Sequence, residues 1–375
     1  MKNFVFYNPV KIIFGIGETT KLGVETKAVG ERPLVVFGKT SAKETGLDSR
    51  CLNILKECGL KPTPFYGIEP NPRESTCDKA VAIVSENDCD CVVGVGGGSV
   101  MDASKLIAVS ASGEKPVWSY VKREVKAESA LPVVLLPTLA ATGSEFNAGA
   151  VITNWETKEK FGFHSPFIFP KVSIMDPELT ASTPPNHTAY GGVDIIIHVL
   201  ETYLTTDDEH TPVQDYVSEG VMKTVMEYLP QALIEGNDLT ARSQLSWASA
   251  VALSGMPNNG RSGGFLMHWM EHIMSAYYDI PHGLGLAYLL LPTLEYVEKH
   301  FPSRFEKFVS NVTDDIRGFL VSIDCLTSLK EMGIPERMAT RFVGDLFEQK
   351  AIEGIIPGNP QLTKEGAKRI YLGKY

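Results

Sequence analysis

The feature that most constrains the fold is an apolar run followed at once by a glycine turn and a helix-like segment. Cys91–Val95 predicts a strand, Gly96–Gly98 form the turn, and Ser99–Ser110 has helical periodicity. Glycines let the backbone approach a pyrophosphate without a Cβ clash, and the free N–H groups of a helix start attract negative charge. Since Ser99 stands where the motif G-x-G-x-x-G has its third glycine, the turn fits either a dinucleotide site or a tight turn without a ligand.

The same alternation recurs through the first half of the chain. Apolar runs at 33–37, 132–136 and 172–175 predict further strands, and 49–58 predicts a helix. Strands that alternate with helices are typical of a parallel sheet with crossover helices. The polar segment 113–130 is expected to be a surface excursion between strands.

The pattern changes near Ser182–Asn186, where paired prolines block a continuing helix. A chain of 375 residues exceeds the size at which one core keeps growing. We therefore expect a dinucleotide-binding α/β domain over 1–183 and an all-helical metal-binding domain over 184–375. In the second domain, periodicity predicts helices at 194–204, 213–229, 239–253, 265–278, 285–300, 305–308 and 340–349.

A second small-residue segment also follows an apolar run. Pro137–Glu145, with the sequence PTLAATGSE, comes directly after Val133–Leu136. Ligands of open α/β sheets bind beyond the carboxyl ends of the strands, so both segments are expected at the same edge of the sheet. Two such loops favour a dinucleotide site more strongly than one.

The second half concentrates metal-ligating residue types. Asp194 and His198 lie four residues apart in an aliphatic segment, so one helical face carries both. His268 and His272 repeat this spacing, and His282 follows a proline. Any one of these histidines alone is more often a hydrogen-bonded core residue, but together with a carboxylate they suit Fe²⁺ or Zn²⁺.

Charge and composition exclude several kinds of partner. The chain has 35 Lys and Arg against 45 Asp and Glu, a formal charge of −10, and no basic cluster that would follow a nucleic-acid backbone. The apolar N-terminal stretch is broken by Asn8, Pro9 and Lys11, which indicates neither a signal peptide nor a membrane span. We therefore expect a cytoplasmic protein with neither a nucleic-acid nor a membrane partner.

Five segments resemble the iron-containing, group III alcohol dehydrogenases. Their order and spacing agree over essentially the whole chain, and the stretch ATGSEFNAGAVIT is most similar to NADPH-dependent butanol dehydrogenases and aldehyde reductases. The last fifty residues carry no such motif. The matching segments are GGGSVMDASK at 96–105, LPTLAATGSE at 136–145, DPELTASTPP at 176–185, GGVDIIIHVLETY at 191–203 and HWMEHIMSAYYDIPHG at 268–283.

This resemblance implies a Rossmann-like N-terminal domain and an all-α C-terminal domain, as in the dehydroquinate synthase-like fold. It also implies a homodimer that transfers a hydride between NADP(H) and a primary alcohol or aldehyde. Fe²⁺, with Zn²⁺ as the second candidate, would be bound by Asp194, His198, His268 and His282, with His272 unligated and catalytic. Cofactor contacts are implied for Asn71, Gly97, Gly98, Ser99, Asp102, Thr138, Thr142, Lys160 and Leu179.

The segment after the first long strand predicts a preference for NADP(H) over NAD(H). Gly38 stands where the resemblance places an aspartate in NAD-preferring members, and no acid occurs before Glu44. Such an acid binds the ribose hydroxyls of NAD and repels the 2′-phosphate of NADP. Ser41 can donate a hydrogen bond to that phosphate, and Lys39 or Lys43 can supply charge.

Two other interpretations were weighed. His268–His272 matches the metallopeptidase motif H-x-x-E-H, and the glycine turn also fits a nucleotide-binding protein without redox activity. A peptidase has no use for two dinucleotide-type loops, and it leaves Asp194, His198 and His282 unexplained. Glu201, one turn after His198, is either a group that orients a metal ligand or a surface carboxylate.

Overall fold

The computed structural model describes residues 1–208, 210–352, 356 and 358–374. It forms two compact units, whose main division lies between Thr183 and Pro184. Two short segments group differently from the ranges expected from sequence: Met1–Phe6 belongs to the helical unit, and Gly236–Ala250 belongs to the α/β unit. None of the described helices has the length and apolar character needed to cross a bilayer.

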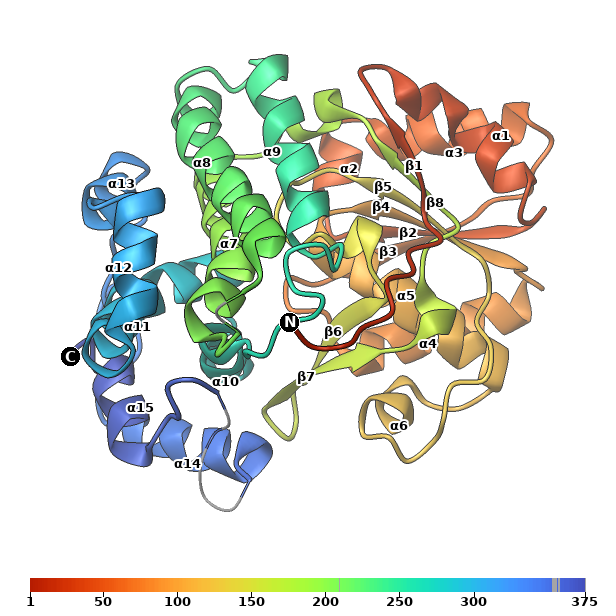
Figure 1. Cartoon of the computed structure of the whole chain (residues 1–375). Coiled ribbons are helices and arrows are strands. Elements are labelled where there is room, and N and C mark those ends of the chain that lie inside the picture. Colours follow the sequence, from red (N-terminus) through yellow and green to blue (C-terminus); the bar gives the residue numbers. More distant parts are fainter. Residues whose placement is uncertain (209, 353–355, 357, 375) are drawn as a thin grey trace. The chain divides into compact units, whose positions relative to one another are not determined.

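The α/β unit is built on a six-stranded parallel sheet in the order β1-β8-β5-β4-β2-β3 (Figure 1). Because every pairing is parallel, all strands end at the same edge. The predicted α/β class is confirmed, although sequence patterning did not predict β1 and β3. The strands are β1 (Lys11–Phe14), β2 (Pro33–Gly38), β3 (Thr63–Ile68), β4 (Cys91–Gly96), β5 (Val133–Pro137) and β8 (Val172–Met175).

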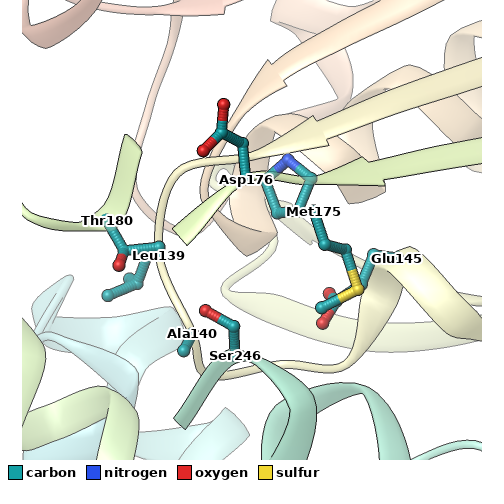
Figure 2. A pocket seen from close by; sticks show the side chains of 8 residues that line it. Leu139, Ala140, Glu145, Met175, Asp176, Thr180 and Ser246 are labelled. Atoms are coloured by element: carbon teal, nitrogen blue, oxygen red, sulfur yellow. The ribbon is translucent and has the colours of Figure 1, made fainter. Parts of the chain in front are cut away.

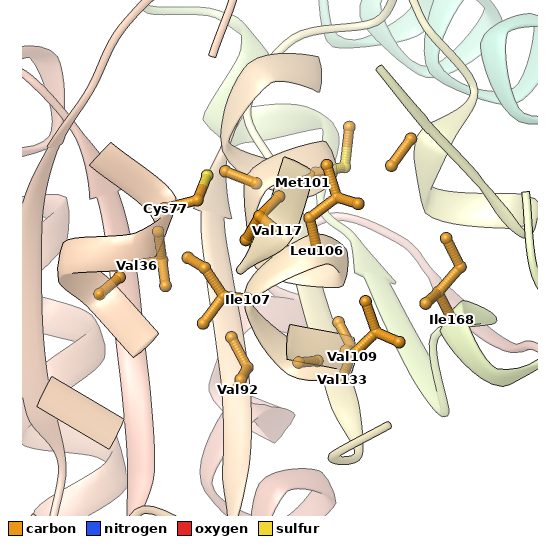
Figure 3. Packing of buried hydrophobic residues seen from close by; sticks show 14 of the residues in the cluster. Val36, Cys77, Val92, Met101, Leu106, Ile107, Val109, Val117, Val133 and Ile168 are labelled. Atoms are coloured by element: carbon orange, nitrogen blue, oxygen red, sulfur yellow. The ribbon is translucent and has the colours of Figure 1, made fainter. Parts of the chain in front are cut away.

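Alternate side chains of the central strands enter two separate cores. Leu34 and Val36 of β2 pack into one hydrophobic cluster, whereas Val35 and Phe37 pack into the other. Figure 3 shows the first cluster, where Leu106 of α5 and its helical neighbours cover one face of the sheet. This burial on both faces explains why the strands read as unbroken apolar runs.

Part of the segment expected at the surface is buried. Within 113–130, Val117 and Tyr120 of helix α6 (Val117–Val121) belong to the core of the α/β unit. The expectation of a surface excursion is therefore wrong for α6, because its apolar side chains are buried in this core. The helices of the α/β unit are α1 (Leu22–Lys27), α2 (Ser41–Glu44), α3 (Leu47–Glu57), α4 (Glu74–Glu86), α5 (Gly98–Gly113), α6 and most of α9 (Leu239–Ala252).

An antiparallel hairpin follows β5 and was not predicted. Strands β6 (Gly149–Asn154) and β7 (Glu159–His164) pair in a separate two-stranded sheet. Short 3-10 turns complete the unit. They are η1 (Glu18–Lys21), η2 (Ser144–Phe146), η3 (Pro166–Ile168) and η4 (Pro177–Thr180).

The second unit is helical, as predicted. Its first helix, α7, begins nine residues before the predicted start, because Pro185 occupies its first turn, where a missing N–H costs nothing. Helix α7 spans Pro185–Thr205. The other helices are α8 (Pro212–Ile234), α10 (Leu266–Tyr278), α11 (His282–His300), α12 (Pro302–Asn311), α13 (Ile316–Ser322), α14 (Met338–Lys350) and α15 (Lys364–Tyr371).

Candidate functional site

Three helices of the helical unit bring four predicted metal ligands together. Asp194 and His198 lie one turn apart on α7, His268 lies on α10, and α11 begins at His282. Asp194 Oδ1 is 3.5 Å from His198 Nε2, 3.4 Å from His268 Nε2 and 3.7 Å from His282 Nε2. A tetrahedral ion with ligands about 2.1 Å away separates its ligand atoms by about 3.4 Å. The three distances from Asp194 Oδ1 are therefore close to the ligand-to-ligand spacing of a tetrahedral ion.

Three buried polar atoms in this cluster lack hydrogen bonds. Asp194 Oδ1, His198 Nδ1 and His268 Nε2 have no hydrogen bond of good geometry within the described part of the chain. Burying such groups without a partner is costly. Ligating atoms of Asp194, His268 and His282 all lie within 4.8 Å of one another, while His198 lies outside this set of three. The donor set and its orphaned atoms fit a divalent cation.

Charges within the cluster are strongly coupled. Burial opposes ionisation of Asp194, but His198 and the other histidines more than offset this and hold its pKa well below the usual range. Burial lowers the pKa of His198 to about 3. Although burial lowers the pKa of His268, the negative charges of Glu201 and Asp194 more than offset this and raise it to about 10. The ionised Asp194 carboxylate therefore lies between a His198 ring whose pKa is lowered and a His268 ring whose pKa is raised.

Two further carboxylates fix the orientation of the histidine rings. Glu201 contacts His268 Nδ1 and also accepts from the His268 backbone N–H at 3.2 Å. Glu271 contacts His282 Nδ1 in the same way. Both glutamates are almost completely buried. Each pair leaves the opposite ring nitrogen, Nε2, facing Asp194.

His272 lies beside this cluster but is not one of its four residues. It is 8% exposed, and its ring centroid is 5.7 Å from that of His282 and 6.5 Å from that of His268. A second group of close ligating atoms joins His272 with Glu271 and His282. The structure therefore places this histidine next to the rings of His268 and His282, two of the three histidines that surround Asp194 Oδ1.

In the α/β unit, the predicted dinucleotide residues follow the carboxyl ends of neighbouring strands. Gly38 ends β2, Gly97 follows β4, and Thr138 follows β5. Gly96 pairs with Pro137, and the Thr138 N–H donates to the Gly96 carbonyl at 3.1 Å. The two loops expected from sequence are therefore adjacent at one edge of the sheet.

Thr142 packs against the start of α5. Gly97 precedes this helix, Gly98 and Ser99 form its first turn, and no side chain caps it in the described structure. A Cβ added at Gly98 would lie 2.3 Å from Thr142 Cγ2, so only glycine fits there without movement. First-turn N–H groups have no acceptor within the helix and favour an anion. The arrangement can accept a phosphate group.

The Asp102 carboxylate accepts one hydrogen bond from a side chain and one from the backbone of the same unit. Its Oδ1 accepts from Ser144 Oγ at 2.6 Å, and its Oδ2 accepts from the Val151 N–H at 2.8 Å. Nearby, the fully buried Lys105 donates to the carbonyls of Ser144 and Gly149 at 2.6 and 2.8 Å. Burial raises the pKa of Asp102 and lowers that of Lys105 to about 8. These two residues of α5 anchor the segment after the second loop.

The remaining predicted cofactor residues are distributed along the same unit. Lys160 of β7 donates to Asn71 Oδ1 at 2.8 Å, which brings together two predicted residues 89 positions apart. Leu179 is buried in η4, after β8. Ser41 is exposed at the start of α2, three residues beyond Gly38. Ser41 and Gly38 thus stand at the end of β2.

Sequence reasoning missed three residues that organise these sites. Glu271 was considered only as a peptidase residue, since no local spacing links it to His282. Lys105 offered a signal, because a lysine three residues after Asp102 in an otherwise apolar helix needs buried acceptors. Ser249 of α9, which hydrogen-bonds the second loop, offered none.

Comparison with known proteins covers both units. Residues 9–177 match the model for iron-containing alcohol dehydrogenase, and residues 188–372 match the C-terminal model for the Fe-containing alcohol dehydrogenase family. The chain is 40% identical to the probable NADH-dependent butanol dehydrogenase 1 of Bacillus subtilis, over 92% of this chain and 91% of that protein. It is 33% identical to the NADPH-dependent aldehyde reductase YqhD of Escherichia coli, over 99% of each.

A solved structure gives the same result. The crystal structure of NADH-dependent butanol dehydrogenase A from Thermotoga maritima superposes with a TM-score of 0.90 at 34% identity, over 99% of this chain and 98% of that one. Matches of this extent define the class, an NAD(P)-dependent oxidoreductase of alcohols and aldehydes. The chain belongs to the iron-containing alcohol dehydrogenase family, as the sequence resemblance implied. The family implies a metal and a nicotinamide cofactor.

The two rival interpretations are not supported. The glutamate of the H-x-x-E-H match, Glu271, contacts the ring of His282. It is therefore engaged as an orienting group, whereas a peptidase needs this residue to activate water. The relatives are oxidoreductases by name, which disfavours a nucleotide-binding protein without redox activity.

Proposed function

We propose that this chain reduces aldehydes to primary alcohols, and oxidises such alcohols, with one Fe²⁺ bound by Asp194, His198, His268 and His282. The observation that carries the proposal is the convergence of three Nε2 atoms on Asp194 Oδ1 at 3.4–3.7 Å. Zn²⁺ is the second candidate, because it takes the same ligands. A metal held by these residues would supply Lewis-acid chemistry, which polarises an aldehyde carbonyl or lowers the pKa of an alcohol.

The protein's own residues supply alignment and proton movement. Glu201 and Glu271 hold the ligand rings, and His272 exchanges the proton that conversion between aldehyde and alcohol requires. Gly97, Gly98 and Ser99 receive the pyrophosphate at the start of α5. Thr138, Thr142 and Leu179, with Asn71, Asp102 and Lys160, complete the dinucleotide site. The nicotinamide would supply the hydride in aldehyde reduction and accept it in alcohol oxidation.

The metal is tested by removing a ligand. His268→Ala and Asp194→Ala are expected to lose bound metal and turnover together, because each leaves an incomplete ligand set. The measurements are elemental analysis and NADPH oxidation with butanal. Full activity after exhaustive chelation, with metal shown to be absent, would overturn the proposal.

The role of His272 is tested by comparing its removal with the removal of His282, a proposed metal ligand of the same residue type. His272→Ala is expected to keep the metal and lose most turnover, whereas His282→Ala loses the metal. The measurement is metal content together with kcat for each variant. Retention of metal by His282→Ala and its loss from His272→Ala would reverse the assignment.

We further propose that NADP(H) is preferred over NAD(H). Names of relatives do not decide this point, since both NADH-dependent and NADPH-dependent enzymes are similar to the chain. Support comes from the end of β2, where Gly38 carries no charge and Ser41, Lys39 and Lys43 are exposed. Lys43 Nζ lies 3.8 Å from the centroid of the Tyr66 ring. The sequence has no carboxylate between Gly38 and Glu44 that would repel a 2′-phosphate.

Gly38→Asp tests this preference cleanly. A Cβ at Gly38 would meet Val100 and Ile68 only at 3.8 and 3.9 Å, so a side chain fits without strain. The added carboxylate is expected to lower kcat/KM for NADPH at least tenfold and to spare NADH. Gly38→Ser controls for size without charge. An unchanged cofactor ratio in Gly38→Asp would show that this turn does not read the 2′-position.

The proposal also includes a cytoplasmic homodimer. The six cysteines are free and five are buried, which suits a reducing compartment. The dimer rests on resemblance to the family. Light scattering of the purified protein tests the dimer, and fractionation of cells tests the location.

A further inference from the structure

The second dinucleotide loop, residues 138–143, contains no helix or strand. Thr138 and Thr142, both assigned to the cofactor in the proposed function, lie in it. A loop without regular structure needs other contacts to fix its backbone, because ordering each residue opposes binding by loss of conformational entropy. The Thr138 N–H is held by the Gly96 carbonyl, whereas the Ala141 and Gly143 N–H groups are held by a distant helix, α9.

Ser249 of α9 holds two backbone groups of the loop. Its Oγ accepts from the Ala141 N–H at 3.1 Å and from the Gly143 N–H at 3.2 Å. The same hydroxyl donates to Glu145 Oε1 at 3.2 Å. A serine hydroxyl offers one donor and two acceptor positions, so all three are used. Ser249 is fully buried, and water cannot replace these bonds.

A small pocket lies behind the loop (Figure 2). It is lined by Leu139, Ala140, Glu145 and Ser246, among others, and its volume is about 10 Å³, room for at most one water molecule. The pocket is therefore too small for a ligand, and the loop is closely packed on this side. The bonds through Ser249 add a fixed hydrogen-bond geometry to that packing.

The loop position also controls the space at the start of α5. Thr142 Cγ2 lies where a Cβ of Gly98 would stand, so the loop and the first turn of α5 are in close contact. A displacement of the loop would therefore change the space at the first turn of α5. Resting on the proposed function, we propose that Ser249, oriented by Glu145, is a positioning residue that holds loop 138–143 in the shape that binds the dinucleotide.

Removal of the hydroxyl is expected to weaken dinucleotide binding. Ser249→Ala leaves the Ala141 and Gly143 N–H groups without their acceptor, and we expect the Kd for NADPH to rise about tenfold. The KM for NADPH should rise similarly, while kcat at saturating cofactor stays within twofold. Metal content should be unchanged, because the ligands belong to the other unit.

Matched variants separate positioning from a general effect on α9. Ser246→Ala removes a buried hydroxyl one turn earlier, which bonds the Arg242 carbonyl of its own helix at 2.8 Å. It should bind NADPH like the wild type. Ser249→Thr retains a hydroxyl and should recover most affinity. In Glu145→Gln, the amide oxygen can still accept from Ser249, so affinity should also be retained.

The experiment is a fluorescence titration of each purified variant with NADPH and NADH, with hydrogen exchange measured at residues 141 and 143. Faster exchange there, together with weaker binding in Ser249→Ala alone, supports the proposal. If Ser249→Ala does not fold, Ser249→Cys keeps the shape with a poor acceptor and should show the same loss. Wild-type affinity in either variant, or an equal loss in Ser246→Ala, overturns it. A wild-type protein that binds neither dinucleotide would instead overturn the proposed function.

Discussion

At the scale of single residues, the metal cluster depends on which ring nitrogen of each histidine faces inward. The packing of α10 beside α7 places His268 near Asp194, but it does not by itself choose between Nδ1 and Nε2. Glu201 makes that choice for His268, and Glu271 makes it for His282. A buried carboxylate on one nitrogen fixes the tautomer and increases the basicity of the other.

Replacing either carboxylate is therefore expected to weaken metal binding. Glu201→Gln and Glu271→Gln should each raise the Kd for Zn²⁺ or Fe²⁺ by about 10–100-fold, because a neutral amide supports the opposite nitrogen less well. Competition with a chromogenic chelator measures this. Glu219→Gln is the control, since Glu219 is buried in the same unit but accepts from Tyr203 Oη at 2.9 Å. Metal affinity equal to that of the control would show that the contacts are incidental.

At the scale of elements, the site depends on the close approach of α7 and α11. A Cβ on Gly283 would lie 2.2 Å from the carbonyl oxygen of Tyr190 and 2.9 Å from its Cα. These are backbone atoms, so a side chain can fit only if the two helices separate. Gly283 follows His282 directly, which ties the position of a ligand to this contact.

Gly283→Ala is expected to displace His282 and reduce metal affinity at least tenfold, with a lower Tm. Chelator competition and thermal unfolding measure the two effects. Gly220→Ala on α8 is the control: a Cβ there meets nothing within 4 Å. It should stabilise the protein by about 0.5–1 kcal/mol, since alanine favours a helix interior. Normal metal binding in Gly283→Ala would show that α11 tolerates the shift.

At the scale of the whole molecule, the dependence of stability on pH is set by a few buried groups. Burial raises the pKa of Glu145 from 4.5 to about 7. The folded protein therefore holds a proton that the unfolded chain releases at lower pH. The stability from this proton is fully present below about pH 4.5 and is lost as the pH rises to about 7.

Glu145→Gln carries no titratable group and should lack this dependence. We expect the Tm of the wild type, relative to that of Glu145→Gln, to fall steadily between pH 5 and pH 7 and then to level off. Scanning calorimetry at pH 5, 6, 7 and 8 measures the difference. Glu86→Gln, at an exposed position of α4, should follow the wild type. Parallel Tm profiles for wild type and Glu145→Gln would show that Glu145 is ionised throughout.

Sequence alone determined the features that are local along the chain. Apolar runs such as Pro33–Phe37 and Cys91–Val95 had the right length and composition for buried parallel strands, and both are confirmed. The four-residue spacing of Asp194 and His198 placed both on one face of α7, because helical geometry fixes that outcome. The family was equally visible, since its motifs are contiguous segments.

Only the tertiary structure decided what depends on contacts between distant segments. The hairpin β6–β7 and helix α6 gave weak local patterns, yet their apolar side chains are buried by the sheet and α5. Nothing near Glu271 or Ser249 in the sequence marks the ring or the loop that each one orients. Their partners lie 11 and more than 100 residues away. Such pairings come from packing, which fixes hydrogen-bond partners only after the helices have taken their places.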